Sequence, residues 1–195
     1  HVVTDDLFLS QQISEERLLG WNANNNQQEL RQKLTFYDSR HQPNQSKTWI
    51  DSDSSGNKLY AQVEYSYHQN GSLQQIRTWP DLVGINDNPT GRLSQTTYSY
   101  DGTFPTLVNT ETKGSPGETQ LQTTTSYHAQ LGVPIQVVLP NGAVESAGYD
   151  GLGRIRWACF NEWGCNETGV VFWVSYDDTA PWNMTVGRPG MANRQ

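Results

Sequence analysis

The sequence predicts an all-β protein, an antiparallel array of short hairpins, and three observations carry this prediction. A tyrosine followed by aspartate or histidine recurs along the chain. Hydrophobic residues make up only 34% while aromatic residues reach 11%, and 17 glycines punctuate the sequence. Thin strands that each bury one aromatic-rich face account for this composition, because antiparallel strands can leave their other face in water.

The recurring dipeptide ends a stretch of β-forming residues and precedes a turn. Aspartate accepts backbone N–H bonds in such turns, and glycine supplies the positive φ that reverses the chain. The sequence "VVLPNGAVE" adds an Asn-Gly turn between apolar flanks, a strong hairpin signal. The repeats, degenerate and unevenly spaced, are Tyr37-Asp38, Tyr67-His68, Tyr100-Asp101, Tyr127-His128, Tyr149-Asp150 with Gly153 and Arg154, and Tyr176-Asp177.

Residues 5–34 differ in character and predict short helical turns near the N-terminus. "SEERLLG" offers Ser14 as an N-cap, acidic residues in the first turn and Gly20 as a stop. "QQELRQKL" predicts another short turn, although its apolar positions are sparse. The expected organisation is an N-terminal segment over 1–33, a repeat β-sheet region over 34–178, and an irregular Gly/Pro-rich tail over 179–195.

The repeat resembles that of the Rhs or YD-repeat family. "LPNGAVESAGYDGLGRI", Leu139 to Ile155, matches the family's unit, which has a Pro-Asn-Gly turn, a strand, and then Tyr-Asp-x-x-Gly-Arg. "YHQNGSLQQI" and "YHAQLGVPIQVVLPNG" are looser copies, and "YDSRHQP" and "YDDTAPW" are looser still. The resemblance covers roughly residues 34 to 176.

The resemblance implies a sheet of hairpins that spirals into a hollow shell. Such shells occur in the B and C components of insecticidal toxin complexes, in bacterial polymorphic toxins and in teneurins. A complete shell needs more repeats than this chain holds, so the resemblance is to a fragment or a small relative. The family's self-cleaving core ends in Asp-Pro, and no Asp-Pro dipeptide occurs here. Autoproteolysis and an enclosed effector are therefore not expected of these residues.

Candidate catalytic and metal sites are few. The "GLGR" glycines lead into a strand rather than a helix, so a turn is favoured over a phosphate loop. The four histidines are scattered, and no enzymatic activity is expected. Asp51, Asp53 and Ser55 match the first, third and fifth positions of a calcium loop, but Gln62 replaces the bidentate glutamate at the twelfth position. A hairpin turn is the preferred interpretation, calcium is the alternative, and no cofactor is expected.

The seven tryptophans carry the rival functional hypothesis, a carbohydrate-binding module. Exposed indole rings stack on sugars, but hairpins with few aliphatic residues also bury them. Trp157 and Trp173 lie on alternating strands and are expected in the core. The candidates for sugar stacking lie beside turn-like segments and are Trp49, Trp79 and Trp182.

The cysteine content and the net charge limit the cellular compartments and the partners that fit this sequence. Cys159 and Cys165 are the only cysteines, and either a local disulfide in an exported protein or two reduced thiols fits their spacing. The net charge of −7 argues against nucleic acid and anionic membranes. No apolar run approaches the ~20 residues of a membrane helix, so membrane insertion by this segment is not expected.

These observations favour a non-catalytic function. We expect a structural or interaction segment of a secreted or cell-surface Rhs-type protein, either toxin-encapsulating or adhesive. Its strand edges should pair with further repeats, a partner toxin component or another copy of the chain. Glycans are the expected partners if the carbohydrate-binding alternative holds.

Overall fold

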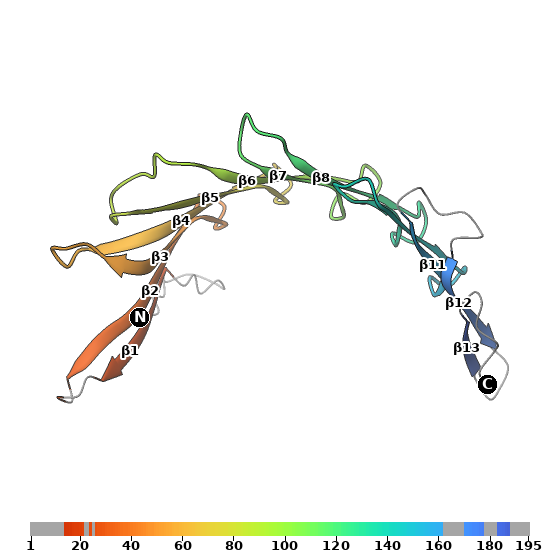
Figure 1. The fold of residues 1–195 in the computed structure, drawn as a ribbon, viewed down its shortest axis with the longest axis horizontal. Helices are drawn as coiled ribbons and strands as arrows, with labels where there is room; N and C mark the ends of the chain where they lie inside the picture. Colours follow the sequence, from red (N-terminus) through yellow and green to blue (C-terminus); the bar gives the residue numbers. More distant parts are fainter. Residues whose placement is uncertain (1–13, 22–23, 25, 162–169, 178–182, 188–195) are drawn as a thin grey trace. The chain divides into compact units, whose positions relative to one another are not determined.

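The structure is a computed structural model, and it describes residues 14–21, 24, 26–161, 170–177 and 183–187. Every regular element in this part of the chain is a β-strand, which confirms the all-β antiparallel prediction. The strands follow one another in chain order through a 13-stranded antiparallel sheet (Figure 1). They are β1 (Glu15–Trp21), β2 (Gln27–Tyr37), β3 (Pro43–Ser52), β4 (Lys58–Tyr67), β5 (Leu73–Val83), β6 (Ser94–Tyr100), β7 (Val108–Gly114), β8 (Leu121–Tyr127), β9 (Pro134–Val138), β10 (Val144–Tyr149), β11 (Ile155–Asn161), β12 (Val170–Asp177) and β13 (Asn183–Gly187).

The chain divides into two compact units. Unit 1 comprises His1–Thr97 and Lys113–Thr119, and unit 2 comprises Tyr98–Thr112 and Gln120–Gln195. The strands of the array begin at Glu15 and continue to Gly187. Within the described residues, no helix is long and apolar enough to cross a membrane.

The predicted N-terminal helical turns are wrong wherever the structure describes those residues. "EERLLG" lies in β1 and "QQELRQKL" lies in β2, and the two strands pair antiparallel from Glu15↔Leu34 to Trp21↔Gln27. The helical signals were local, and the sparse apolar positions could not supply the tertiary packing that stabilises a short helix. Pairing with the neighbouring strand satisfies the same backbone groups. The part of this prediction that concerns residues 5–13 lies outside the described residues.

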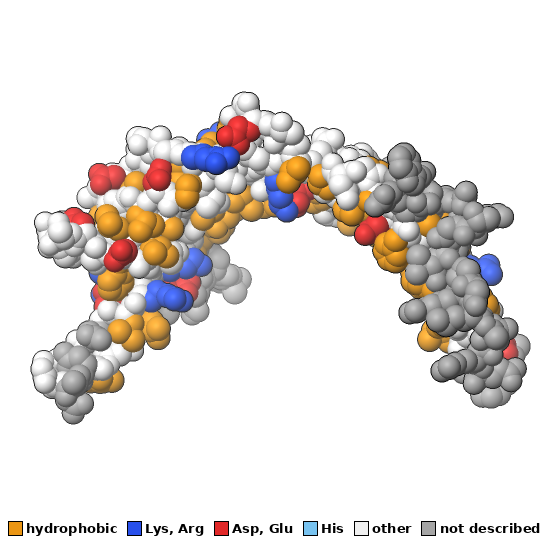
Figure 2. Space-filling view, viewed as in Figure 1, with side chains coloured by type: hydrophobic (Ala, Val, Ile, Leu, Met, Phe, Trp, Pro, Cys, Tyr) orange, Lys and Arg blue, Asp and Glu red, His pale blue; other side chains and the backbone are white. Residues whose placement is uncertain are grey.

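Both units bury few side chains, as expected of thin hairpins. In unit 1 the buried side chains are mostly polar: Gln32, Ser46, Lys47, Gln62 and Tyr60. In the described part of unit 2 they are Ala158, Cys159 and Val174. Many large hydrophobic side chains stay exposed, and they appear as orange patches on both units in Figure 2. Backbone ladders and cross-strand pairs, rather than a deep core, therefore hold the strands together.

Candidate functional site

Most of the repeated turns share one backbone geometry. In five of them the first N–H donates to the carbonyl four residues on, and the N–H three residues on donates back to the first carbonyl. The residue three positions on has a positive φ, the arrangement of a type I turn with a glycine bulge. The five turns begin at Asp38, Asp53, His68, Leu139 and Asp150. The turns at Asp101 and His128 are longer, and their first N–H groups donate to Leu107 and Val133.

The aspartate side chain supports the turn that it begins. Asp150 Oδ1 accepts the N–H groups of Leu152 (2.9 Å) and Arg154 (3.0 Å), and its Oδ2 accepts Arg154 Nε (2.7 Å). Burial raises the pKa of Asp150, but these hydrogen bonds outweigh it, so the pKa lies below its ordinary value. Arg154 also lies 4.2 Å above the Tyr176 ring. Where histidine replaces aspartate at residue 128, its Nδ1 accepts the Gln130 N–H at 3.3 Å.

The tyrosine before the turn fastens its strand to the strand before it. In four cases the hydroxyl donates to the carbonyl of the first residue of that neighbouring strand. Burial raises the pKa of Tyr67 and of Tyr127, so these phenols remain protonated donors. The four bonds run from Tyr67 to Pro43 (2.8 Å), Tyr127 to Val108 (2.6 Å), Tyr149 to Pro134 (2.9 Å) and Tyr176 to Ile155 (3.0 Å). We call this bond the tyrosine clamp.

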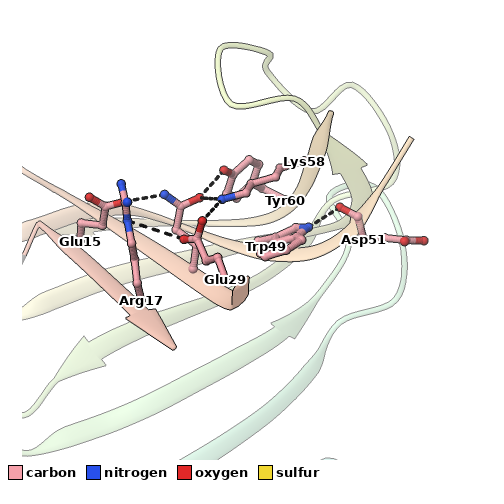
Figure 3. A network of polar contacts seen from close by, with 8 residues as sticks. Glu15, Arg17, Glu29, Trp49, Asp51, Lys58 and Tyr60 are labelled. Carbon is pink, nitrogen blue, oxygen red and sulfur yellow. Dashed lines mark hydrogen bonds and ion pairs between the residues drawn. The ribbon is translucent and has the colours of Figure 1, made fainter. Parts of the chain in front are cut away.

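A ring of polar side chains covers one face of β1, β2 and β4 in unit 1 (Figure 3). Glu15 Oε1 accepts Arg17 Nε at 2.6 Å and Gln32 Nε2 at 2.5 Å. The side-chain oxygen of Gln32, Oε1, accepts the Tyr60 hydroxyl at 2.6 Å and Lys58 Nζ at 3.1 Å. Two further ion pairs close the ring through Glu29, with Lys58 Nζ at 2.5 Å and Arg17 Nε at 3.6 Å. We call these six residues the polar ring.

The polar ring pairs its opposite charges internally, although Glu29 Oε1 is buried without a hydrogen bond. Hydrogen bonds from Arg17 and Gln32 hold the pKa of Glu15 below its ordinary value, and the bond to Glu15 raises the pKa of Arg17. Burial raises the pKa of Tyr60. Glu15 is thus kept ionised and Tyr60 protonated near neutral pH. Because each cation has a carboxylate partner inside the ring, the arrangement suits cross-strand stabilisation better than proton transfer.

Trp49 and Trp79 lie on the same face as the polar ring. Lys58 Nζ lies 4.6 Å from the centre of the Trp49 ring, and Trp49 Nε1 donates to the Asp51 carbonyl at 2.7 Å. Trp79 is half-buried and is the cross-strand partner of the fully buried Gln62. The indole of Trp49 therefore already has a cation on its face. Trp182, the third sugar-stacking candidate, lies outside the described residues.

Lys47 is buried next to Gln62 in unit 1. Its Nζ donates to the carbonyls of Ile85 (2.7 Å) and Asp87 (3.0 Å), which belong to the segment after β5. Burial lowers the pKa of Lys47. The lysine side chain thus holds that segment over the sheet, a contact with no sign in the sequence because it joins positions about forty residues apart.

The calcium candidates form a hairpin turn between β3 and β4. Asp53 accepts the N–H groups of Ser55 (2.9 Å) and Asn57 (2.8 Å) and the Asn57 side-chain amide (2.9 Å). These bonds hold the pKa of Asp53 below its ordinary value. Asp51 Oδ1 accepts the Ser52 N–H at 2.8 Å. Among the described residues, no group of three or more His, Cys, Asp or Glu side chains could hold a metal ion.

Cys159 is fully buried in β11 and takes part in a disulfide bond. Cys165, its expected partner, lies outside the described residues. Trp157, expected in the core, is 37% exposed, whereas Trp173 is half-buried.

Comparisons with known proteins do not assign a family. A scan of the sequence against models of protein families found no match, and a search of the curated proteins found no significantly similar relative.

Proposed function

We propose that this chain is a non-catalytic segment of a secreted or cell-surface protein of the Rhs type, in which YD repeats build a sheet that serves as a wall or interaction surface. The observation that carries the proposal is the tyrosine clamp followed by its turn. The same two devices recur at unrelated positions of both units. Recurrence favours an architectural function, because a catalytic constellation would occur once.

The polar groups of unit 1 support the absence of catalysis in this proposal. The carboxylates of the polar ring are bound to cations of the same ring, and Asp53 is bound to its own turn. The disulfide at Cys159 supports an oxidising compartment outside the cytosol. The loops of differing length between the repeated turns are the places where contacts with partners would form.

The sheet edges are where the proposed wall would continue. In the strand order of the described residues, β1 and β13 have a neighbour on one side. Both carry exposed apolar side chains, among them Leu18 (56%) and Val186 (54%). An open edge with apolar side chains pairs readily with another strand. Further repeats, a partner component or another copy of the chain would fill this position.

Self-association of the purified chain tests the proposal. Sedimentation velocity over a wide concentration range should show association that grows with concentration. A double variant, Leu18→Lys with Val186→Lys, should shift the chain towards monomer, since lysine at an edge blocks strand pairing. Leu152→Lys is the matched control, because Leu152 is 75% exposed in a turn rather than at an edge. A wild-type chain that stays monomeric and unfolds cooperatively would contradict the proposal.

A further inference from the structure

The face of unit 1 opposite the polar ring contains a pocket, and the Tyr67–Pro43 clamp forms part of its wall. Its volume is about 380 Å³, and its lining includes Glu16, Lys33, Thr35, Tyr37, Ser46 and Tyr65. Cross-strand register places Glu16 opposite Lys33 and Thr35 opposite Ser46. Along β1 and β2 these residues alternate with the residues of the polar ring. Their side chains therefore project from the opposite face of the sheet. The volume is within the range of small-molecule sites.

Two aromatic walls and a set of hydroxyl groups determine which chemistry the pocket suits. Tyr37 and Tyr65 are half-buried and present partly exposed rings. The Tyr65 hydroxyl and Ser46 Oγ are 3.5 Å apart, at the outer limit of a hydrogen bond. A ligand hydroxyl placed between these two groups could bond to both of them better than they bond to each other. Rings beside hydroxyl groups are suited to a molecule that is apolar on its faces and polar at its rim.

The pocket contains two charged side chains of opposite sign, Lys33 and Glu16. Lys33 Nζ lies 3.9 Å from Glu16 Oε1, and the two side chains are 47% and 57% exposed. This pair is loose compared with the 2.6 Å contact between Arg17 and Glu15 on the other face. The side chains of a loose, solvated ion pair can reorient towards a ligand with little loss of free energy, because exposed ion pairs contribute little to stability. With one charge of each sign, the pocket does not select an ionic ligand.

From these features we propose that the pocket binds an uncharged carbohydrate. The tyrosine rings contact the C–H faces of the sugar, Ser46 and the Tyr65 hydroxyl bond to its hydroxyl groups, and Glu16 and Lys33 accept and donate at the rim. A phosphate or carboxylate ligand would need an excess of cations, which Glu16 removes. This site lies on the face opposite Trp49, and although Glu16 belongs to the edge strand β1, the other lining residues lie on β2, β3 and β4. Sugar binding and self-association are measured separately, so failure of one proposal can be told apart from failure of the other.

Binding of neutral disaccharides to the whole chain tests the site. The probes are cellobiose, lactose and N,N′-diacetylchitobiose, with sialyllactose as the charged comparison. The readouts are saturation-transfer NMR and titration calorimetry. At least one neutral probe should bind, and Tyr65→Ala should weaken that binding about tenfold or more, because it removes both the ring and the hydroxyl. Tyr65→Phe keeps the ring and should show an intermediate loss. Trp49→Ala, on the opposite face, is the control and should bind like the wild type.

Three outcomes would overturn the site. One is that no neutral probe binds at millimolar concentration. Another is that Trp49→Ala abolishes binding while Tyr65→Phe and Ser46→Ala, both with wild-type circular dichroism and melting temperature, leave it unchanged. The third is that sialyllactose binds more tightly than lactose, which would assign the pocket to anionic ligands.

Discussion

The β1–β4 region of unit 1 and the β10–β13 region of unit 2 are built with the same turn and tyrosine clamp but hold their strands together by different means. In unit 1 the buried side chains are largely polar and the polar ring links three strands. In unit 2 the described buried side chains are small or apolar, and Cys159 is in a disulfide. The comparison teaches that the turns set the architecture, while the faces of the strands can vary widely in chemistry.

Glycine–tryptophan pairs are the feature of unit 2 that unit 1 lacks among its described pairs. Gly148 is opposite Trp157, Trp157 is opposite Trp173, and Trp173 is opposite Gly187. A Cβ atom on Gly148 would lie 2.0 Å from Trp157 Nε1, and one on Gly187 would lie 2.2 Å from Trp173 Cε2. Each indole therefore lies against the backbone of a neighbouring glycine, which shields that backbone as a side chain of its own would.

Gly148→Ala should break this arrangement and have the largest effect. The added methyl group must displace the Trp157 ring, and overpacking of this kind lowers the free energy of unfolding by about 1–3 kcal/mol. Gly151→Ala is the matched control, because no atom lies within 4 Å of its Cβ position and it is expected to be near neutral. Urea unfolding followed by circular dichroism measures both. Equal stability of the two variants would show that the ring is not held against the glycine.

Tyr60→Phe tests the hydrogen bonds of unit 1 in the same way. The variant removes the buried donor to Gln32 and should lower the free energy of unfolding by about 1 kcal/mol, the usual net value of an intramolecular hydrogen bond. Tyr65→Phe on the other face provides the comparison, since the Tyr65 hydroxyl makes only a 3.5 Å contact with Ser46. Its effect on urea unfolding should be smaller. If Tyr65→Phe proved the more destabilising, the polar ring would not be the stabilising face.

His41→Gly should stabilise the protein by about 0.5 kcal/mol. Glycine relieves the strain of a left-handed backbone conformation, and this gain exceeds the entropy that the more flexible glycine loses on folding. His41 has φ 62°, at the turn position that glycine occupies in four equivalent turns. The reciprocal variant, Gly71→His, places the same side chain at φ 87° and should destabilise by about 1 kcal/mol. Melting temperatures of the two variants should move in opposite directions. Movement in the same direction would contradict the equivalence of the turns.

Acid should weaken the polar ring through Glu15, the smallest of these effects. The pKa of Glu15 is lowered in the folded chain from its ordinary value of 4.5, so its contribution to stability is present above that value. It is lost as the pH falls through the lowered pKa. Urea unfolding at several pH values should therefore show wild type and Glu15→Gln converging in acid. A stability difference that is constant down to a pH of about 3 would contradict the assignment.

How far the sequence predicts this fold depends on whether the signal is local. The turns at Asp38, Asp53 and Asp150 were predictable, since side chain and backbone meet within four residues. The strands β1 and β2 were mistaken for helical turns, because helix caps and helix formers are equally local signals. Glu15 and Arg17 are two residues apart, a spacing that places both side chains on one face of a strand. This spacing could have indicated β-structure and part of the polar ring.

The candidate sites were less predictable. Trp49 was a candidate for sugar stacking under the alternative hypothesis, and nothing in the sequence indicated that Lys58 from the next strand lies over its ring. The pocket beside Tyr65 had no sequence signal, because its walls come from four strands brought together by register. A register shift of one residue in any of these strands would move the side chains that line the pocket to the other face of the sheet.

By itself, the sequence determined where many of the turns lie and, from about residue 34 onward, that the chain forms antiparallel strands. Those features depend on the conformational freedom of glycine and on aspartate bonding to its own turn, which are properties of a few neighbouring residues. Only the tertiary structure decided which side chains meet across the strands. The polar ring, the glycine–tryptophan pairs and the tyrosine pocket depend on register and on the β-bulges that shift it, and these result from all neighbouring strands acting together.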